Sequence, residues 1–326
     1  MNAIETVDLT KKFGNFTAVD SVNIQVKEGE IFGLLGPNGA GKSTTISMLC
    51  TILKPTSGTA NINGYDIVHQ PGHVRKSIGI VFQDPSIDDK LTGRENMEMH
   101  ADLYDVPRDV MHSRIDEVLR LVELEDRASS YVNTYSGGMR RRLEIARSLI
   151  HYPKVLFLDE PTIGLDPQSR EHIWNYIRDL KERENITIIL TTHYMEEADE
   201  LCDRIAIIDR SKIIAMDTPH NLKEQLESET ITVETKDNDL FAAKLAETKL
   251  AEKITESDGE LSLSVKNAHT SLPRVVELAV STGVYIDSIS IREPDLDDVF
   301  MYYTGREIRE SGSKEPTGMA ARMRGR

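Results

Sequence analysis

The sequence predicts an α/β fold with a largely parallel sheet, followed by a smaller α+β domain. Short apolar runs such as "IFGLLG", "KVLFLDE" and "ITIILTTH" alternate with helical stretches over residues 1–222. Continuous apolar strands between helices are typical of a parallel sheet that is covered on both faces. A chain of 326 residues is long enough for one large domain and a smaller one, each with its own core.

The strand pattern stops between residues 92 and 134. Thr92 and Glu95 have the spacing of a capping box, which marks the start of a helix. Apolar residues then recur at helical spacing, at Ile115, Val118, Leu119 and Val122. We therefore predict a helical subdomain, at about residues 92–150, that is inserted into the first domain.

The pattern changes again beyond residue 222. Residues 229–305 predict a strand, a helix, a hairpin of two strands, a helix, a strand and a final helix, an order typical of a ferredoxin-like domain. We expect the final helix to pack its apolar face on this domain's sheet through Leu296, Val299, Phe300 and Tyr303. Residues 306–326 are predicted to be a disordered tail, and the alternative is contact between its basic end and a membrane surface.

The composition argues against several classes of protein. A formal net charge of −15 argues against general nucleic-acid binding, which needs a basic face. Cys50 and Cys202 lie in apolar surroundings without metal-site spacing, as expected of a reduced intracellular chain. We expect no signal peptide, and the apolar runs are far shorter than the roughly 20 residues that span a bilayer. If the protein works at a membrane, we expect another chain to anchor it.

One stretch predicts a phosphate site. "GPNGAGKST" lies between an apolar strand and a helix, and it matches the pattern GxxxxGK[ST]. Backbone N–H groups in such a loop wrap the phosphates of a nucleotide, Lys42 neutralises their charge, and Ser43 offers a hydroxyl to Mg²⁺. The predicted binding residues are Gly36, Pro37, Asn38, Gly39, Ala40, Gly41, Lys42, Ser43 and Thr44.

Polar residues end three other apolar strands. Asp159 and Glu160 follow "VLFL", where Asp159 can hold Mg²⁺ and Glu160 can polarise an attacking water. Gln83 ends "SIGIVFQ" and His193 ends "ITIILTTH". Because ligands bind at the carboxyl ends of strands in such sheets, we expect these side chains to face the terminal phosphate.

These motifs, together with Ser136-Gly137-Gly138 and Gly164-Leu165-Asp166-Pro167, resemble the nucleotide-binding subunit of an ABC transporter over residues 4 to about 220. The resemblance implies a P-loop NTPase with a RecA-like core, and ATP and Mg²⁺ as cofactors. It assigns Glu160 as the catalytic base, His193 as the switch histidine and Asp166 as the D-loop acid. It assigns Asp159, Ser43 and Gln83 to the metal, and Gln83 also to catalysis. Phe13 matches the aromatic that stacks on adenine, with Phe16 as the competing candidate.

The signature "YSGGM" departs from the usual LSGGQ at Tyr135 and Met139. In this family the signature caps the γ-phosphate of ATP that a second subunit holds. The resemblance therefore implies that Ser136, Gly137 and Gly138 bind ATP across an ATP-dependent homodimer. We expect the three arginines that follow, residues 140–142, to form a solvated first turn without a catalytic role.

Three longer stretches, "YSGGMRRRLEIARSL", "EPTIGLDPQSR" and "PDLDDVFMYYTGRE", resemble the daunorubicin/doxorubicin-resistance type of ABC ATPase. This implies a peripheral subunit on the cytoplasmic face of the membrane that powers export through a separate integral-membrane permease. The cargo stays open between a drug, a lipid, a polysaccharide and sodium.

Two alternatives are less favoured. A soluble ABC protein that acts on DNA or ribosomes would need long coiled coils or a second cassette, and the chain has one cassette with about 90 residues between its motifs. A nucleotide sensor without turnover would not need Lys42, Asp159, Glu160 and His193 all intact.

Overall fold

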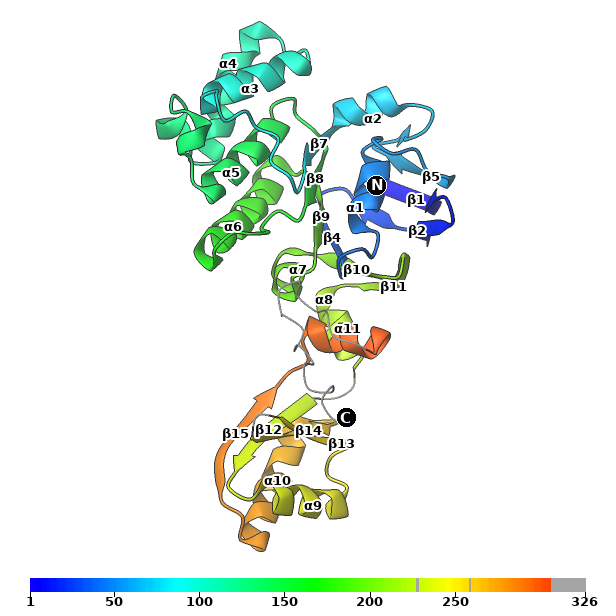
Figure 1. Ribbon diagram of the computed structural model, residues 1–326, viewed down its shortest axis with the longest axis vertical. Coiled ribbons are helices and arrows are strands. Elements are labelled where there is room, and N and C mark those ends of the chain that lie inside the picture. The colour runs from blue at the N-terminus through cyan, green and yellow to red at the C-terminus, as the bar shows by residue number, and fades with distance from the viewer. Residues whose placement is uncertain (227–228, 258, 306–326) are drawn as a thin grey trace, which may run out of the picture.

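The computed structural model describes residues 1–226, 229–257 and 259–305. The larger part of the chain forms one body, and a smaller sheet with two helices lies beyond it along the long axis of the molecule (Figure 1). The predicted tail, residues 306–326, lies outside the described residues.

A six-stranded sheet with the order β11-β10-β4-β9-β8-β7 forms the centre of the larger body. All neighbouring strands are parallel except β11, which is antiparallel to β10 at one edge. The parallel sheet that the sequence predicts is therefore confirmed. The strands are β4 (Ile31–Leu35), β7 (Ile78–Val81), β8 (Val155–Asp159), β9 (Thr187–Thr192), β10 (Arg204–Asp209) and β11 (Lys212–Asp217).

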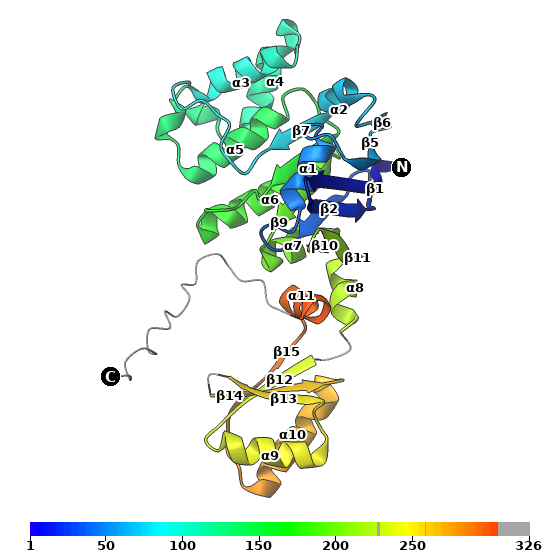
Figure 2. The same cartoon turned by 45° about the vertical axis from the view of Figure 1, so that its right-hand side comes forward.

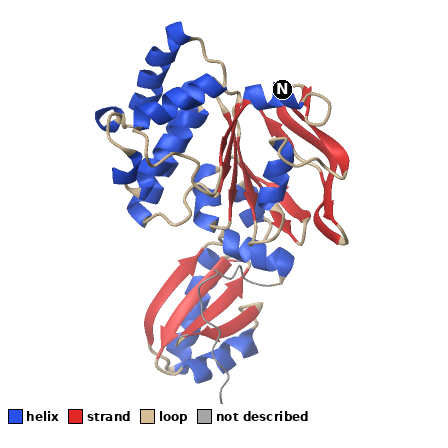
Figure 3. Ribbon diagram, turned by 45° about the horizontal axis from the view of Figure 1, so that its top comes forward, coloured by secondary structure: helices blue, strands red, loops and turns tan. Residues whose placement is uncertain are grey.

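Both faces of the central sheet are buried, which explains the continuous apolar runs. Leu156 packs in a core with α6 (Pro167–Glu184) and α7 (Met195–Leu201), whereas its neighbour Phe157 packs in a second core with α1 (Lys42–Leu49). That second core is closed by an antiparallel sheet and α2 (Pro71–Ser77) (Figure 3). The strands of this sheet are β1 (Asn2–Phe13), β2 (Phe16–Val22), β3 (Gln25–Lys27), β5 (Ser57–Ile62) and β6 (Tyr65–Asp66).

The helical subdomain lies to one side of the central sheet (Figure 1). It contains α3 (Gly93–Leu103), α4 (Arg108–Leu121) and α5 (Gly137–Ser148). The capping box is confirmed, because Thr92 accepts a hydrogen bond from the backbone of Glu95 and the Glu95 side chain accepts one from Thr92. The predicted apolar stripe is buried, at Ile115, Val118, Leu119 and Val122.

The smaller unit has the strand order β13-β14-β12-β15, with all neighbouring strands antiparallel. Two helices cover one face of this sheet, so the order of elements is the predicted ferredoxin-like one (Figure 2). The elements are β12 (Glu229–Thr235), α9 (Asn238–Thr248), β13 (Lys253–Ser257), β14 (Glu260–Val265), α10 (Ala268–Thr282) and β15 (Ile286–Arg292).

The final helix, α11 (Leu296–Thr304), packs on the larger body and not on the small sheet. Leu296, Val299 and Phe300 are buried in the same core as Leu201 of α7 and Leu222 of α8 (Pro219–Glu224). Tyr303 is partly exposed, and its hydroxyl donates to the Gln225 side chain at 2.7 Å. The expectation that α11 packs on the small sheet is therefore wrong.

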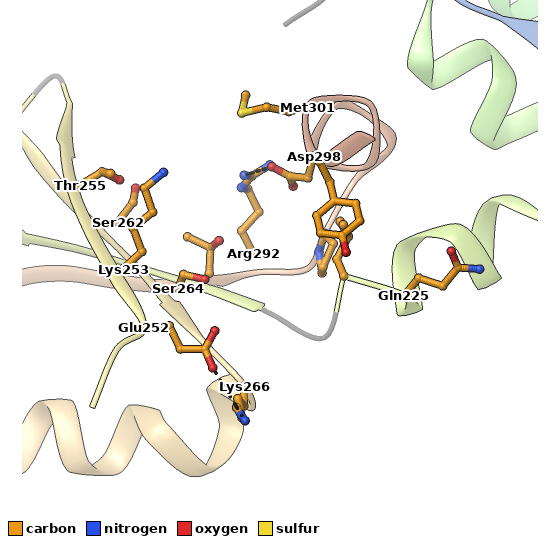
Figure 4. Close-up of a pocket in the computed structure, with 14 residues that line it drawn as sticks. Gln225, Glu252, Lys253, Thr255, Ser262, Ser264, Lys266, Arg292, Asp298 and Met301 are labelled. Carbon is orange, nitrogen blue, oxygen red and sulfur yellow. Dashed lines mark hydrogen bonds and ion pairs between the residues drawn. The ribbon is translucent and has the colours of Figure 1, made fainter. Parts of the chain in front are cut away.

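The chemistry of the small sheet explains this difference. The face turned toward α11 carries hydroxyl groups and charges, including Thr230, Ser262, Ser264 and Arg292, and so it offers no apolar surface for the helix. A cavity of about 850 Å³ separates that face from α11. Figure 4 shows Arg292 reaching across it toward Asp298 of α11, to which it donates at 3.0 Å.

Candidate nucleotide site

The loop between β4 and α1 places the predicted phosphate-binding residues at the carboxyl edge of the central sheet. A Cβ atom at Gly36 would lie 2.2 Å from the carbonyl oxygen of Ile208, and one at Gly41 would lie 2.4 Å from that of Ala18. Gly41 also has a φ of 111°, which side chains rarely adopt. Both glycines are therefore required by the close approach of neighbouring backbone, whatever else the loop binds.

Lys42 lies across this loop and meets the end of β8. Its Nζ donates to the carbonyl of Gly36 at 2.7 Å and lies 3.4 Å from Oε1 of Glu160. The Lys42 side chain is only 4% exposed, and burial lowers its pKa despite the nearby carboxylates of Glu160 and Asp159. A cation held this close to the loop can neutralise a phosphate that binds there.

Glu160 is held by two neighbours at the end of β8. Its Oε1 lies 3.3 Å from Nδ1 of His193, in addition to the contact with Lys42. Burial raises the pKa of Glu160, but the hydrogen bond with His193 and the charge of Lys42 outweigh burial, so the pKa lies below its usual value. The carboxylate is therefore ionised near neutral pH and can accept a proton.

The backbone of Glu160 is strained. Its φ is 47°, in the left-handed region, which costs a non-glycine residue about 1–2 kcal/mol. Its N–H donates to the carbonyl of Thr191 at 3.2 Å and to the Thr191 hydroxyl at 3.0 Å. Strain of this kind persists only where surrounding contacts impose it, and it is common at functional sites.

Asp159 precedes Glu160 and faces the phosphate loop. The hydroxyls of Ser43 and Thr191 both donate to its Oδ1, the first at 3.1 Å. A carboxylate next to a hydroxyl fits Mg²⁺, which prefers oxygen ligands and keeps several water molecules and phosphate oxygens. The third predicted metal ligand, Gln83, is exposed in the loop that follows β7.

The structure thus brings the loop 36–44, Asp159, Glu160 and His193 together at one edge of the sheet. The two aromatic candidates for the adenine contact both lie exposed at the β1–β2 turn, Phe13 at 49% and Phe16 at 61%. The choice between Phe13 and Phe16 therefore stays open.

The signature residues begin α5 in the helical subdomain. Ser136 is the N-cap, and its Oγ accepts from the backbone N–H of Met139 at 3.3 Å. Gly137 and Gly138 form the first turn, where backbone N–H groups lack intrahelical partners and attract anions. The helix-capping role of Met139 uses its main chain, so loss of the usual glutamine side chain leaves this cap intact.

Tyr135, the other departure from the usual signature, has a structural partner. Its side chain is buried, and its hydroxyl donates to the carbonyl of Arg127 at 2.7 Å. A Cβ atom at Gly93 would lie 2.4 Å from that hydroxyl. The tyrosine therefore fills space in the helical subdomain that a glycine at the start of α3 leaves open.

Asp166 lies at the start of α6. It is the N-cap of that helix, and it accepts from the backbone N–H of Ser169 at 3.0 Å and from the Ser169 hydroxyl at 2.7 Å. These hydrogen bonds lower the pKa of Asp166. Its side chain is exposed, so Asp166 is accessible from outside this copy of the chain.

The prediction of a solvated arginine turn is wrong for Arg141. Arg140 pairs with Asp89 at the surface, and Arg142 donates to the carbonyl of Val122, but the Arg141 side chain is only 8% exposed. Three successive residues on a helix point in directions about 100° apart, and on α5 the direction of Arg141 is the one that faces the end of β8. Glu144, one turn later, is the sequence signal for the buried face, since it pairs with Arg141 at 3.0 Å.

Within the described parts of the chain, the helices include none that combines the length and the apolar character needed to cross a membrane.

Comparisons with known proteins find relatives of both parts of the chain. A family model described as "ABC transporter" matches residues 19–163, and one described as "ATP-binding protein DrrA1-3-like, C-terminal domain" matches residues 218–304. The chain is 38% identical over 310 residues to the daunorubicin resistance ATP-binding protein DrrA3 of Streptomyces coeruleorubidus, which covers 94% of this chain and 98% of that protein. It is also 38% identical over 311 residues to the linearmycin resistance ATP-binding protein LnrL of Bacillus subtilis, covering 94% and 100%.

A solved structure shares the fold of the larger body. The chain is similar to an ATP-binding cassette solved as a dimer in a post-hydrolysis state bound to ADP and Pi, with a TM-score of 0.59 and 29% identity. That match covers 66% of this chain and 98% of the other. The P-loop ABC fold predicted from the sequence is therefore confirmed. The chain belongs to the ABC transporter family, as an ATP-binding, ATP-hydrolysing subunit of the branch that contains the daunorubicin resistance proteins.

Proposed function

We propose that this chain powers the export of a drug or another hydrophobic molecule through a separate membrane permease. The observation that carries the proposal is the position of Glu160, whose carboxylate lies between Lys42 and His193 beside the phosphate loop. A carboxylate in that position can activate a water molecule for attack on the terminal phosphate of a bound nucleotide. The two relatives described above are named for resistance to daunorubicin and linearmycin, which supports a drug as the cargo. A lipid, a polysaccharide or sodium is the alternative.

In this proposal each residue has one task. Residues 36–44 bind the phosphates of ATP through backbone N–H groups, and Lys42 neutralises the terminal phosphate. Glu160 accepts a proton from the attacking water, and His193 orients the Glu160 carboxylate through the 3.3 Å contact. Ser43 and Asp159, with Gln83, would hold Mg²⁺, which supplies positive charge to the phosphate oxygens. Phe13 would stack on the adenine.

We further propose that two copies assemble around ATP. The N-terminus of α5, with Ser136, Gly137 and Gly138, would bind the terminal phosphate held by the other copy, and Asp166 would lie at the same interface. The dimeric state of the ADP-bound relative supports this arrangement. The large negative net charge of −15 supports the absence of nucleic acid among the partners.

We propose that the chain divides into two domains, with the boundaries predicted from the sequence. Residues 1–222 form the ATPase domain, with the helical subdomain at about 92–150, and residues 229–305 form an accessory α+β domain. We propose that α11 attaches the accessory domain to the ATPase domain, since Phe300 lies in the core that also contains Leu222.

A substitution of Glu160 tests the proposal. Glu160→Gln keeps the shape of the side chain but removes the base, so we expect steady-state ATP hydrolysis to fall by at least about 10²-fold. We also expect the variant to elute as a dimer from gel filtration in Mg-ATP, because ATP stays bound between the copies. A monomeric variant that still hydrolyses ATP would contradict the assignment. Copurification of a membrane permease with the tagged chain tests the export role separately.

A further inference from the structure

We propose that Arg141 is a positioning residue for ATP hydrolysis, which holds the backbone at Glu160 and the loop that carries Gln83. The inference rests on the proposed function, because it takes Glu160 as the base and two copies as the active form. Arg141 lies near the start of α5, five residues beyond the N-cap Ser136. It therefore connects the signature helix to the hydrolytic site of its own copy.

The guanidinium of Arg141 binds three successive carbonyl groups, those of the last residue of β8 and of the two residues that follow it. Nη2 donates to the carbonyls of Asp159 at 3.0 Å and Glu160 at 3.1 Å, and Nε donates to that of Pro161 at 2.8 Å. Nη1 donates to the carbonyl of Phe82 at 2.6 Å and to the carboxylate of Glu144 at 3.0 Å. One planar side chain thus fixes the segment that carries both Asp159 and Glu160.

The match between donors and acceptors is complete. A guanidinium has five N–H donors in a fixed plane, and Arg141 makes five hydrogen bonds. A lysine would keep the charge, but its three N–H donors come from a single nitrogen, so it cannot reach acceptors that lie along different edges of the guanidinium. The site is therefore built for arginine specifically.

The contact bears on catalysis through the strained backbone of Glu160. The N–H of Glu160 donates to Thr191, and its carbonyl accepts from Arg141, so both sides of the left-handed residue are held. Without Arg141, the carbonyls of residues 159–161 lose the guanidinium that they share. The backbone of Glu160 can then relax away from its left-handed conformation. The Glu160 carboxylate would then leave the place between Lys42 and His193.

The same helix face holds both ends of the loop around Gln83. Arg141 binds the carbonyl of Phe82 on one side of Gln83. On the other side the backbone N–H of Ser86 donates to Glu144 at 2.8 Å, and Arg147 donates to the Ser86 carbonyl and hydroxyl. The side chain of Gln83 is exposed while the loop that carries it is anchored on both sides. Arg141 therefore sets the position of a second motif as well as that of Glu160.

Mixed dimers of full-length chains separate this role from a folding defect. In the first mixture, a small amount of Arg141→Gln chains is combined with a large excess of Glu160→Gln chains. In the mixed dimer that forms, the only working base belongs to the chain that lacks Arg141. In the second, a small amount of wild-type chains is combined with an excess of Arg141→Gln/Glu160→Gln chains. The wild-type copy then supplies the only working base, and the altered α5 of the other copy contacts the ATP that the wild-type copy holds. The phosphate released in a single turnover is measured per limiting chain.

We expect the first mixture to lose about 10²-fold in rate, as a small misplacement of a catalytic group does, and the second to stay within about threefold of the control. The control mixes limiting wild-type chains with Glu160→Gln chains, and an inactive control would count against the proposed function instead. Equal losses in both mixtures, or a loss confined to the second, would overturn the role of Arg141 in its own copy's site.

Two further measurements complete the test. We expect Arg141→Gln and Arg141→Lys to lower kcat while the KM for ATP changes by less than about threefold, because the phosphate loop is untouched. Arg140→Gln removes the same charge one residue earlier on α5, where its partner Asp89 is exposed, and we expect wild-type kcat. An unchanged kcat in Arg141→Lys, or a loss that appears only in KM, would contradict the proposal.

Discussion

Oε1 of Glu160 lies 3.3 Å from Nδ1 of His193, across the carboxyl ends of the neighbouring parallel strands β8 and β9. The register of this pair sets the distance, because Asp159 lies opposite Thr191 and each functional residue follows shortly after its strand. Strand pairing thus brings together a carboxylate and an imidazole that are 33 residues apart in the chain.

This contact predicts a change in pH dependence. The hydrogen bond with His193 and the charge of Lys42 keep the pKa of Glu160 below its usual value, against the effect of burial. His193→Ala removes one of these two opposing effects, so burial weighs more and the pKa of Glu160 rises. We expect the acid limb of the profile of kcat/KM against pH to move to higher pH. We also expect the rate of hydrolysis to fall. His172→Ala, at an exposed position on α6, is the control and should leave the limb in place.

A second prediction concerns the shared ATP site. Ser136→Arg places a bulky cation where the phosphate of the other copy's ATP would lie, so turnover should stop while ATP binding to the monomer stays within about threefold. Fluorescent-ATP titration of the monomer and phosphate release from the dimer measure the two properties. Ser113→Arg adds the same side chain to the exposed face of α4 and should change neither. Parallel losses of binding and turnover in Ser136→Arg would argue against a shared site.

A third prediction concerns the metal. Asp159→Asn replaces a carboxylate by a neutral amide, and a charge-assisted contact is worth about 1.5–3 kcal/mol, or about 10-fold to 150-fold in affinity. The Mg²⁺ concentration that gives half-maximal hydrolysis should therefore rise by about that factor. Binding of ATP in EDTA, where no metal contributes, should stay close to wild type. Hydrolysis with unchanged Mg²⁺ dependence would show that another group holds the metal.

The motifs at the phosphate site could be predicted from the sequence because each is local. The glycines, Lys42 and Ser43 lie within one short stretch, residues 36–43, and Asp159 and Glu160 directly follow the apolar run "VLFL". Parallel pairing then places all such strand ends at one edge of the sheet. The capping box at Thr92 was predictable for the same reason, since both its partners lie within one turn.

The role of Arg141 could not be predicted in this way. Its acceptors at Phe82 and Pro161 lie 59 and 20 residues away in the chain, and they are backbone carbonyls, which no residue type marks. The helical period places the three adjacent arginines in different directions around the helix, but it does not show what each of them contacts. The surface that α11 covers was missed for a related reason, because an amphipathic pattern marks an apolar face without naming its partner.

The packing of α11 leads to a last prediction, about stability. Phe300 is 1% exposed in the core shared with α7 and α8, and loss of a buried phenylalanine side chain costs about 3–5 kcal/mol. Phe300→Ala should therefore lower the unfolding midpoint of the ATPase domain. The fluorescence of Trp174 on α6, which packs against the same core, measures that transition. Tyr302→Ala, on the same helix at 66% exposure, should change the free energy of unfolding by less than about 0.5 kcal/mol. If Phe300→Ala left the ATPase transition unchanged and only the small domain unfolded earlier, α11 would be packed on the small sheet after all.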